Sequence, residues 1–258
     1  MAATAPACAA QAMCAGSAAG RDVVVDVRDL SRAFGAHRAL HRVSLQVQVG
    51  ERLAIFGPNG SGKTTLLRLL ALLLRPTSGR LRLFGYEAWP AAHELRARIG
   101  FLGHRPLLDE ELTATENLAF YARLYGVPQA GARIAELLDL VGLGPARHRR
   151  VRTFSRGMQQ RLSLARAVLH DPDLLLLDEP DTGLDPAGLE VLAALLARSS
   201  RPRTLIFSSH RPEVALHLAP RAVLLSAGRL VADGPAAEVA ARLATHPLGP
   251  AARAVGAG

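Results

Sequence analysis

Hydrophobic and polar residues alternate in two stretches near the start of the chain. Residues 23–30 (VVVDVRDL) and 42–49 (RVSLQVQV) show a period of two, which predicts strands with one solvated face. Residues 52–56 (RLAIF) predict a short apolar strand that runs into a glycine-rich turn and a leucine-rich helix. Residues 80–85 (RLRLFG) predict a strand that closes an antiparallel portion.

From about residue 95 to residue 170 the pattern becomes mainly helical, through ATENLAFYARLYG, RIAELLDLVG and LSLARAVLH. Residues 174–178 (LLLLD), 204–210 (TLIFSSH) and 222–226 (AVLLS) then predict strands, with helices over 186–198 and 236–244. Continuous apolar strands are typical of a parallel sheet covered by helices on both faces. The expected fold class is therefore α/β, a mostly parallel sheet flanked by helices, with an antiparallel β portion and an inserted helical lobe.

The composition agrees with one sizeable globular domain. The chain has 258 residues, of which 49% are hydrophobic and 21% charged. Its net charge of +9 is spread along the chain with one tight cluster (RHRRVR, 147–152), so an arginine-rich surface explains it better than a nucleic-acid site. The longest apolar run, residues 66–75, is too short to span a bilayer. Both cysteines lie in the alanine-rich leader, so we expect no disulfide in the folded part.

A phosphate-binding motif follows the strand 52–56. Residues 57–65 (GPNGSGKTT) match the P-loop pattern G-x-x-x-x-G-K-[ST], whose glycines let backbone N–H groups wrap a triphosphate at a helix N-terminus. Lys63 is the single lysine of the chain, and it stands where a slim ammonium meets the β- and γ-phosphates of ATP. Thr64 is expected to ligate Mg²⁺. The expected nucleotide-binding residues here are Gly57, Pro58, Asn59, Gly60, Ser61, Gly62, Lys63, Thr64 and Thr65.

Two carboxylates and a histidine follow the predicted buried strands. Asp178 and Glu179 stand at the carboxyl end of LLLLD, where ligands of open α/β sheets gather. We expect Asp178 to hold Mg²⁺ and Glu179 to polarise the water that attacks the γ-phosphate. His210 ends TLIFSSH and is expected to donate to the γ-phosphate or to that water. Helix capping is the alternative role for the acids, and a structural role is the alternative for the histidine.

The stretch FSRGMQQR (154–161) begins the helix that precedes the acid pair. Ser155 is a favourable N-cap, and a helix start that includes Gly157 can bind an anion. With the P-loop and LLLLDEP, this stretch resembles the signature, usually written LSGGQ, of the ATP-binding subunits of ABC (ATP-binding cassette) transporters. Arg156 and Met158 depart from the common pattern, which has Gly and Gln there.

The resemblance implies that the signature completes the ATP site of a second subunit. In that family two ATP molecules are sandwiched in a head-to-tail dimer. It also implies that Phe34 stacks on adenine, with core packing as the alternative, and that Asp185 in GLDP faces the dimer partner. The signature residues expected to contact the partner's ATP are Ser155, Arg156, Gly157, Met158 and Gln159.

The loop between sheet and lobe, in IGFLGHRPLLDEELTATENL, carries His104 where the family normally has a Gln that senses Mg²⁺. His104 thus joins Thr64 and Asp178 as a candidate metal-site residue. With LTATENL after it, His104 resembles the haem-export (cytochrome c maturation) branch, although Arg105 departs from that branch's pattern. Leu107, Leu108 and the acids at 109–111 lie where the family docks a coupling helix of the membrane subunit. A solvated helix start is the alternative reading of this segment.

The resemblance covers residues 23 to about 239 and implies a P-loop ATPase subunit that powers export through separate integral-membrane subunits. It would act as a homodimer or heterodimer at the cytoplasmic face of the membrane, with ATP and Mg²⁺ as cofactors and haem as the cargo of the branch it resembles. Residues 22–246 would form the ATPase domain, with its lobe at about 95–170. Residues 1–21 would be a disordered tail and 247–258 a loose one.

Two other classes of function are open at this point. One is the ATPase of another exporter, of the drug or lipid type. The second is a soluble ABC ATPase that acts on nucleic acid or ribosomes, but such proteins usually carry two cassettes or a long coiled-coil insertion, and we expect no nucleic-acid partner. A P-loop kinase or GTPase gives no reason for the signature, and the chain has no guanine-reading Asn-Lys-x-Asp.

Overall fold

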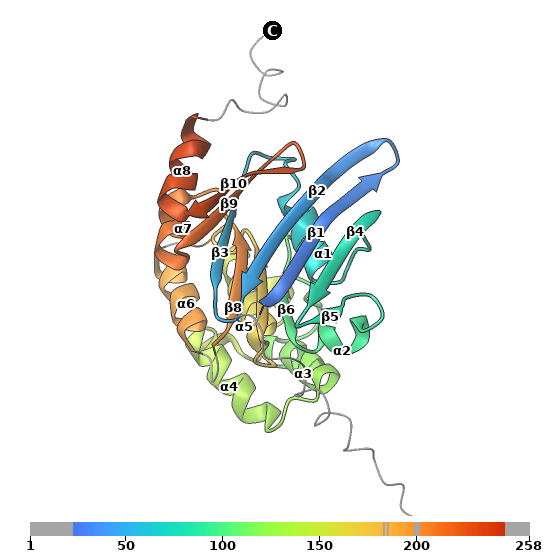
Figure 1. Ribbon diagram of the computed structural model, residues 1–258. Helices are drawn as coiled ribbons and strands as arrows, with labels where there is room; N and C mark the ends of the chain where they lie inside the picture. Colours follow the sequence, from blue (N-terminus) through green and yellow to red (C-terminus); the bar gives the residue numbers. More distant parts are fainter. Residues whose placement is uncertain (1–22, 183, 185, 199–201, 246–258) are drawn as a thin grey trace, which may run out of the picture.

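The computed structural model describes residues 23–182, 184, 186–198 and 202–245. Two sheets and a group of helices make up this part of the chain (Figure 1). The strands are β1 (Val23–Phe34), β2 (His37–Gln48), β3 (Arg52–Phe56), β4 (Ser78–Leu83), β5 (Tyr86–Glu87), β6 (Ile99–Leu102), β7 (Leu174–Asp178), β8 (Thr204–Ser208), β9 (Arg221–Ser226) and β10 (Arg229–Pro235). The α-helices are α1 (Lys63–Leu70), α2 (Ala92–Arg96), α3 (Ala114–Tyr125), α4 (Ala130–Leu140), α5 (Arg156–Val168), α6 (Pro186–Ala197), α7 (Pro212–Leu218) and α8 (Ala236–Thr245).

The larger sheet has six strands in the order β10-β9-β3-β8-β7-β6, and only β10 is antiparallel to its neighbour. Every residue of β7 and β8 is buried. Leu175 and Leu177 join a core with α5, while Leu174 and Leu176 join a second core with α1. Because successive side chains of a strand point to opposite faces, both faces of this sheet are covered, as the apolar runs predicted.

The smaller sheet is antiparallel, in the order β2-β1-β4-β5. Its inner face packs on the opposite side of α1, so that Val25 and Val27 of β1 share a core with Leu66 and Leu69. β4 pairs with β1, which confirms the predicted antiparallel portion. The apolar run at 66–75 is therefore largely the buried helix α1 between two sheets, and among the described residues no helix is long and apolar enough to cross a membrane.

The helices α3 and α4 lie at the lower end of the molecule in Figure 1, and α5 is drawn above them, level with the lower ends of the strands. A capping box begins α3: Thr113 accepts from the Glu116 backbone N–H, and the Glu116 side chain accepts from the Thr113 N–H. The stretch predicted as mainly helical also contains β6, an edge strand that pairs in parallel with β7. α7 and β10 were not predicted either, and both are short, with seven residues each.

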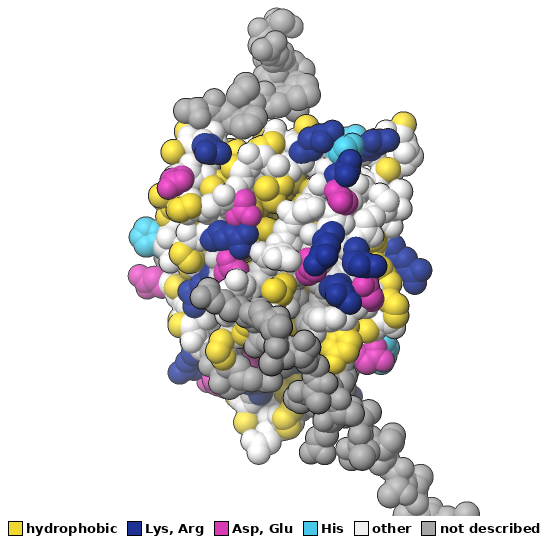
Figure 2. All heavy atoms as spheres, in the orientation of Figure 1, with side chains coloured by type: hydrophobic (Ala, Val, Ile, Leu, Met, Phe, Trp, Pro, Cys, Tyr) yellow, Lys and Arg dark blue, Asp and Glu magenta, His cyan; other side chains and the backbone are white. Residues whose placement is uncertain are grey.

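Charged side chains are interspersed over the surface. Figure 2 shows basic and acidic side chains mixed on the viewed face, with a group of basic side chains over the tip of the β1–β2 hairpin. Within the cluster at 147–152, Arg147 pairs with Asp139, and both Arg150 and Arg152 pair with Glu111. These ion pairs neutralise much of the cluster, in agreement with an arginine-rich surface.

Candidate nucleotide-binding site

The P-loop is a turn that only glycine can make at two positions. β3 ends at Phe56, and Gly57 and Gly62 follow with φ of 149° and 107°. A Cβ at Gly57 would overlap the carbonyl oxygen of Leu225 in β9, and one at Gly62 would lie 2.6 Å from the carbonyl oxygen of Ala39 in β2. The loop therefore lies against both sheets, and side chains at these positions are excluded by sterics as well as by φ.

Lys63, the first residue of α1, is buried, and its ammonium lies inside the loop. Its Nζ donates to the carbonyl oxygens of Gly57 (2.8 Å) and Pro58 (3.1 Å). Burial lowers the pKa of Lys63, while the negative charges of Glu179 and Asp178 act in the opposite direction. Thr64 and Thr65 follow in the first turn of α1, so the N–H groups of a helix start surround the same space.

Asp178 and Glu179 lie at the carboxyl edge of the sheet, next to the end of β8. Ser208 bridges them: its Oγ donates to Asp178 Oδ1 (2.8 Å) and accepts from the backbone N–H of Glu179 (3.0 Å). Glu179 has φ of 53°, an unusual value for a residue with a side chain. The register of the parallel pair, Asp178 opposite Ser208, places these groups together.

His210 contacts Glu179 directly. Its Nε2 lies 2.6 Å from Glu179 Oε1, and Thr182 Oγ1 donates to the other oxygen at 3.4 Å. Both side chains are partly exposed, so the pair borders solvent. An imidazole and a carboxylate in contact at the edge of a sheet can orient a water molecule and take its proton.

A cavity of about 260 Å³ lies over the acid pair. Its lining joins residues from the loop after β6, from the start of α5 and from the end of β7. Arg156 and Gln159 of the signature thus line the same cavity as the acids of their own chain, which the sequence did not predict. The predicted residues that meet here are His104, Arg156, Gln159, Asp178 and Glu179.

The signature begins α5 as a capped helix. Ser155 is the N-cap and its Oγ accepts from the Met158 N–H at 3.3 Å, while the preceding Phe154 is buried and anchors the segment. Ser155 and Arg156 are exposed, so the first turn of the helix is open to a ligand from outside the chain. Gln160 donates to the carbonyl oxygen of Pro180 at 3.3 Å, which connects α5 to the segment after Glu179.

Phe34 is not among the residues that line the cavity over the acid pair. Phe34, at the end of β1, is 46% exposed rather than part of the core, which removes core packing as its role. Asp185 lies outside the described residues. Among the rest of the P-loop, Asn59 and Gly60 are exposed and Ser61 is buried.

Sequence reasoning missed the serines that organise the acids. Besides Ser208, Ser209 donates to Asp181 Oδ2 at 3.0 Å, and both residues of that bond are buried. The available signal was the SSH run that ends a buried strand, since two hydroxyls at that point need acceptors.

The donor set suits a magnesium ion that arrives with ATP. Among the residues that the structure describes, no three His, Cys, Asp or Glu side chains gather as a metal site of their own. Mg²⁺ usually takes one or two protein oxygens and completes its octahedron with phosphates and water. Thr64 Oγ1 and the second carboxylate oxygen of Asp178, whose first oxygen is held by Ser208, fit that requirement.

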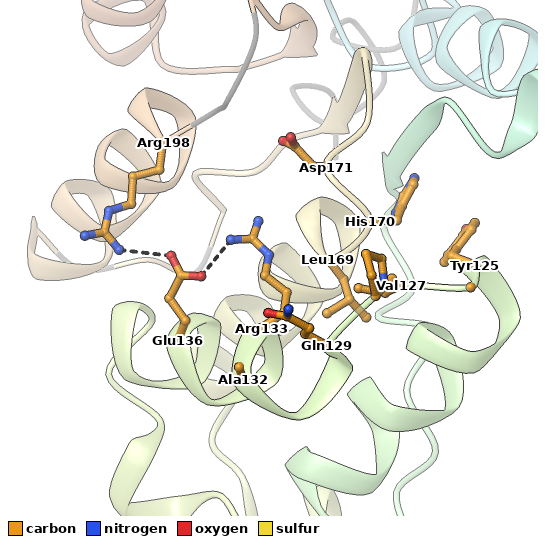
Figure 3. Close-up of a pocket in the computed structure, with 12 residues that line it drawn as sticks. Tyr125, Val127, Gln129, Ala132, Arg133, Glu136, Leu169, His170, Asp171 and Arg198 are labelled. Carbon is orange, nitrogen blue, oxygen red and sulfur yellow. Dashed lines mark hydrogen bonds and ion pairs between the residues drawn. The ribbon is translucent and has the colours of Figure 1, made fainter. Parts of the chain in front are cut away.

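A larger cavity, of about 920 Å³, lies in a different part of the molecule, among α4, the end of α6 and the turn before β7. Figure 3 shows Glu136 between Arg133 and Arg198, with the rings of His170 and Tyr125 side by side. Those rings stack at 4.0 Å between centroids, and His170 Nε2 lies 3.2 Å from the carbonyl oxygen of Ile99. None of the residues predicted to bind ATP lines this cavity.

His170 is expected to make the stability of the fold depend on pH. Burial lowers its pKa from 6.5 to about 4. Between these values the unfolded chain binds more protons than the folded one, so the free energy of unfolding falls as pH drops from 6.5 towards 4, by at most about 3 kcal/mol from this group. We expect His170→Asn to lose part of this dependence, measured by urea unfolding at pH 7 and pH 4.5.

The matched control is His93→Asn, because His93 is exposed on α2. This control should keep the pH dependence of the unchanged protein. The free energy of unfolding could instead change between pH 7 and pH 4.5 by the same amount in the unchanged protein and in His170→Asn. That result would contradict the assignment to His170.

The strand, P-loop and buried lysine, beside two acids and a histidine on neighbouring strand ends, define a P-loop ATPase with a mixed sheet. The family model "ABC transporter" matches residues 40–182. The daunorubicin resistance ATP-binding protein DrrA3 of Streptomyces coeruleorubidus is 39% identical over 85% of this chain and 71% of that protein. The bacitracin transport ATP-binding protein BcrA of Bacillus licheniformis is 36% identical over 82% of this chain and 70% of that protein.

A solved structure is similar over the same region. It is the dimeric ATP-binding cassette MJ0796, in a post-hydrolysis state bound to ADP and Pi, with a TM-score of 0.74 and 26% identity over 82% of this chain and 98% of that chain. The chain therefore belongs to the ABC transporter family, and it is an ABC ATPase that binds ATP. DrrA3 and BcrA are named for a drug and an antibiotic, and these names give no support to the haem-export branch.

Proposed function

We propose that this chain is the ATPase subunit of an exporter of drug-like molecules, which works as a dimer on separate membrane subunits. The observation that carries the ATPase part is the contact of His210 with Glu179 at 2.6 Å. The negative charges of Glu179 and Asp178 also act on the P-loop lysine, Lys63, where they raise its pKa against the effect of burial. The cargo class rests on the drug and antibiotic names of the similar proteins.

In the proposed reaction, the P-loop and Lys63 bind the β- and γ-phosphates, and Thr64, Asp178 and His104 would hold Mg²⁺. The metal neutralises phosphate charge when bound. Glu179 takes a proton from the attacking water and His210 orients it. Phe34 stacks on adenine, and Asp185 faces the dimer partner.

The exposed start of α5 supports a site shared between two subunits. Ser155 to Gln159 would contact the γ-phosphate held by a second copy or by a related chain. The capped, solvent-facing helix N-terminus supports this, because N–H groups at a helix start stabilise an anion. ATP then joins the subunits, and hydrolysis releases them.

Membrane subunits would dock beside the loop after β6. Leu107 is 51% exposed and has φ of 52°, while the hydroxyl of Tyr121 donates to its carbonyl oxygen at 2.7 Å. Phe120 and Leu124 on α3 are exposed as well, and Asn117 bonds both the N–H and the C=O of Asp109. The exposed apolar side chains and the strained backbone of Leu107 support a docking role. The chain would then sit peripherally on the cytoplasmic face of the membrane.

The test is co-expression with a candidate multi-span membrane partner. The chain should sediment with membranes only when the partner is present, and cells with the pair should accumulate less daunorubicin than cells with the partner and Glu179→Gln. Equal accumulation would contradict drug export, and polynucleotide-stimulated ATPase without membrane association would favour the soluble class.

Haem export is the second candidate, and one observation favours it. His104 lines the cavity over Asp178 and Glu179, at the position where the haem-export branch also has histidine. Restored c-type cytochrome formation in cells that lack haem export, with no change in daunorubicin accumulation, would select this candidate.

A further inference from the structure

Phe34 projects from the end of β1 with little support from the core. It is the last residue of the strand, opposite His37, and the turn begins at Gly35 with φ of 57°. A ring that is 46% exposed would ordinarily sample several rotamers. Its position therefore depends on whatever contacts it locally.

The contact that holds Phe34 is a cation on one face. The guanidinium carbon of Arg32 lies 4.5 Å from the centroid of the Phe34 ring. A guanidinium at this distance is attracted by the electron-rich face of an aromatic ring. One face of Phe34 is thus covered, while the residue as a whole remains 46% exposed.

Arg32 is itself fixed to the segment that follows the P-loop helix. Its Nη1 donates to the carbonyl oxygen of Arg75 at 2.9 Å, between α1 and β4. Thr77, in the same connection, donates its N–H to Ser31 O at 2.8 Å and accepts from Ala33 N–H at 3.0 Å. The strand end that carries Phe34 is therefore joined to the connection that follows α1, the helix that begins at Lys63.

β2 completes the connection between the hairpin and the P-loop. The carbonyl oxygen of Ala39 and the Leu40 side chain lie so close to Gly62 that no Cβ fits between them. The hairpin that presents Phe34 thus contacts the phosphate loop at one point and the connection between α1 and β4 at another. This frame sets the distance between the phosphate loop and the Phe34 ring.

We propose that Arg32 is a positioning residue for ATP: it holds one face of Phe34 so that the opposite face stacks on the purine base. This inference rests on the proposed stacking of Phe34 on adenine. Arg32 would act through Phe34 and would not touch the phosphates. It should therefore influence ligands that have a base and leave base-free polyphosphates unaffected.

The experiment measures the dissociation constants of ATP and of inorganic tripolyphosphate by calorimetry in Mg²⁺, on the full chain. We expect Arg32→Met to weaken ATP binding about fivefold, which corresponds to the free energy of an exposed cation–π contact. The binding of tripolyphosphate should be unchanged. Its KM for ATP should rise with kcat unchanged. Arg32→Lys keeps a cation near the ring and should bind ATP with intermediate affinity.

Arg28→Met is the matched control, because Arg28 lies on the same strand, is exposed and pairs with Asp26 instead of a ring. Phe34→Ala separates the two hypotheses and should weaken ATP by about tenfold or more. If Phe34→Ala weakens ATP and neither Arg32 variant does, the role of Arg32 is overturned while the stacking stands. If Arg32→Met weakens the binding of tripolyphosphate as much as that of ATP, the role of Arg32 is also overturned. If Phe34→Ala binds ATP as tightly as the unchanged protein does, the stacking itself is overturned.

Discussion

Glu179→Gln is expected to reduce ATP hydrolysis by about 10²- to 10⁴-fold, the usual contribution of a general base. In the unchanged protein His210 Nε2 lies 2.6 Å from Glu179 Oε1. The amide of glutamine has the size of the carboxylate and can still contact His210, but it cannot take a proton from water. ATP binding should persist, because the P-loop and Lys63 are untouched. The loss of ATP hydrolysis is measured by the rate of phosphate release.

The same variant should accumulate as a dimer in MgATP, since in the proposed mechanism ATP joins the subunits and this variant no longer consumes it. Size-exclusion chromatography with light scattering would detect this state. Glu94→Gln, at an exposed position on α2, is the control and should hydrolyse ATP normally. A Glu179→Gln protein that stays monomeric at saturating MgATP would contradict the shared site.

Ser155→Asp is expected to abolish ATP-dependent dimerisation and to lower hydrolysis by at least about 100-fold. Aspartate is as good an N-cap as serine, so the start of α5 should remain folded. Its charge would face the γ-phosphate of the partner's ATP, and opposed like charges in an interface cost several kcal/mol. ATP binding to the single chain should be unchanged.

Ser155→Asn is the matched control, because asparagine caps the helix without a charge. It should retain much more dimer than Ser155→Asp in the same light-scattering measurement. Hydrolysis that survives in Ser155→Asp would show that the signature does not complete a partner's site.

The parts of the site that could be predicted from sequence are those with local causes. β3 and β7 have the predicted bounds, because short apolar runs bordered by glycine or by acids leave few alternatives. The N-cap at Ser155 was also predictable, since a hydroxyl before a helix start has a local acceptor role.

The parts that could not be predicted depend on which strands are neighbours. β6 was hidden inside a stretch with helical spacing, and it is a strand because β7 offers it a parallel partner. Arg156 and Gln159 were expected to face a partner chain, and the fold also places them at the cavity over their own acids. Local patterns carry no information about such distant neighbours.

Sequence alone determined the phosphate loop, the helix start at Ser155 and the buried character of the central strands. These follow from glycine φ angles, a capping hydroxyl and uninterrupted apolar side chains, all of which act over a few residues. Only the tertiary structure decided that Ser208 bridges Asp178 and Glu179, that His210 contacts Glu179, and that Arg32 covers one face of Phe34. Those contacts need particular strand registers and side-chain directions, which arise when distant segments pack together and bury their common core.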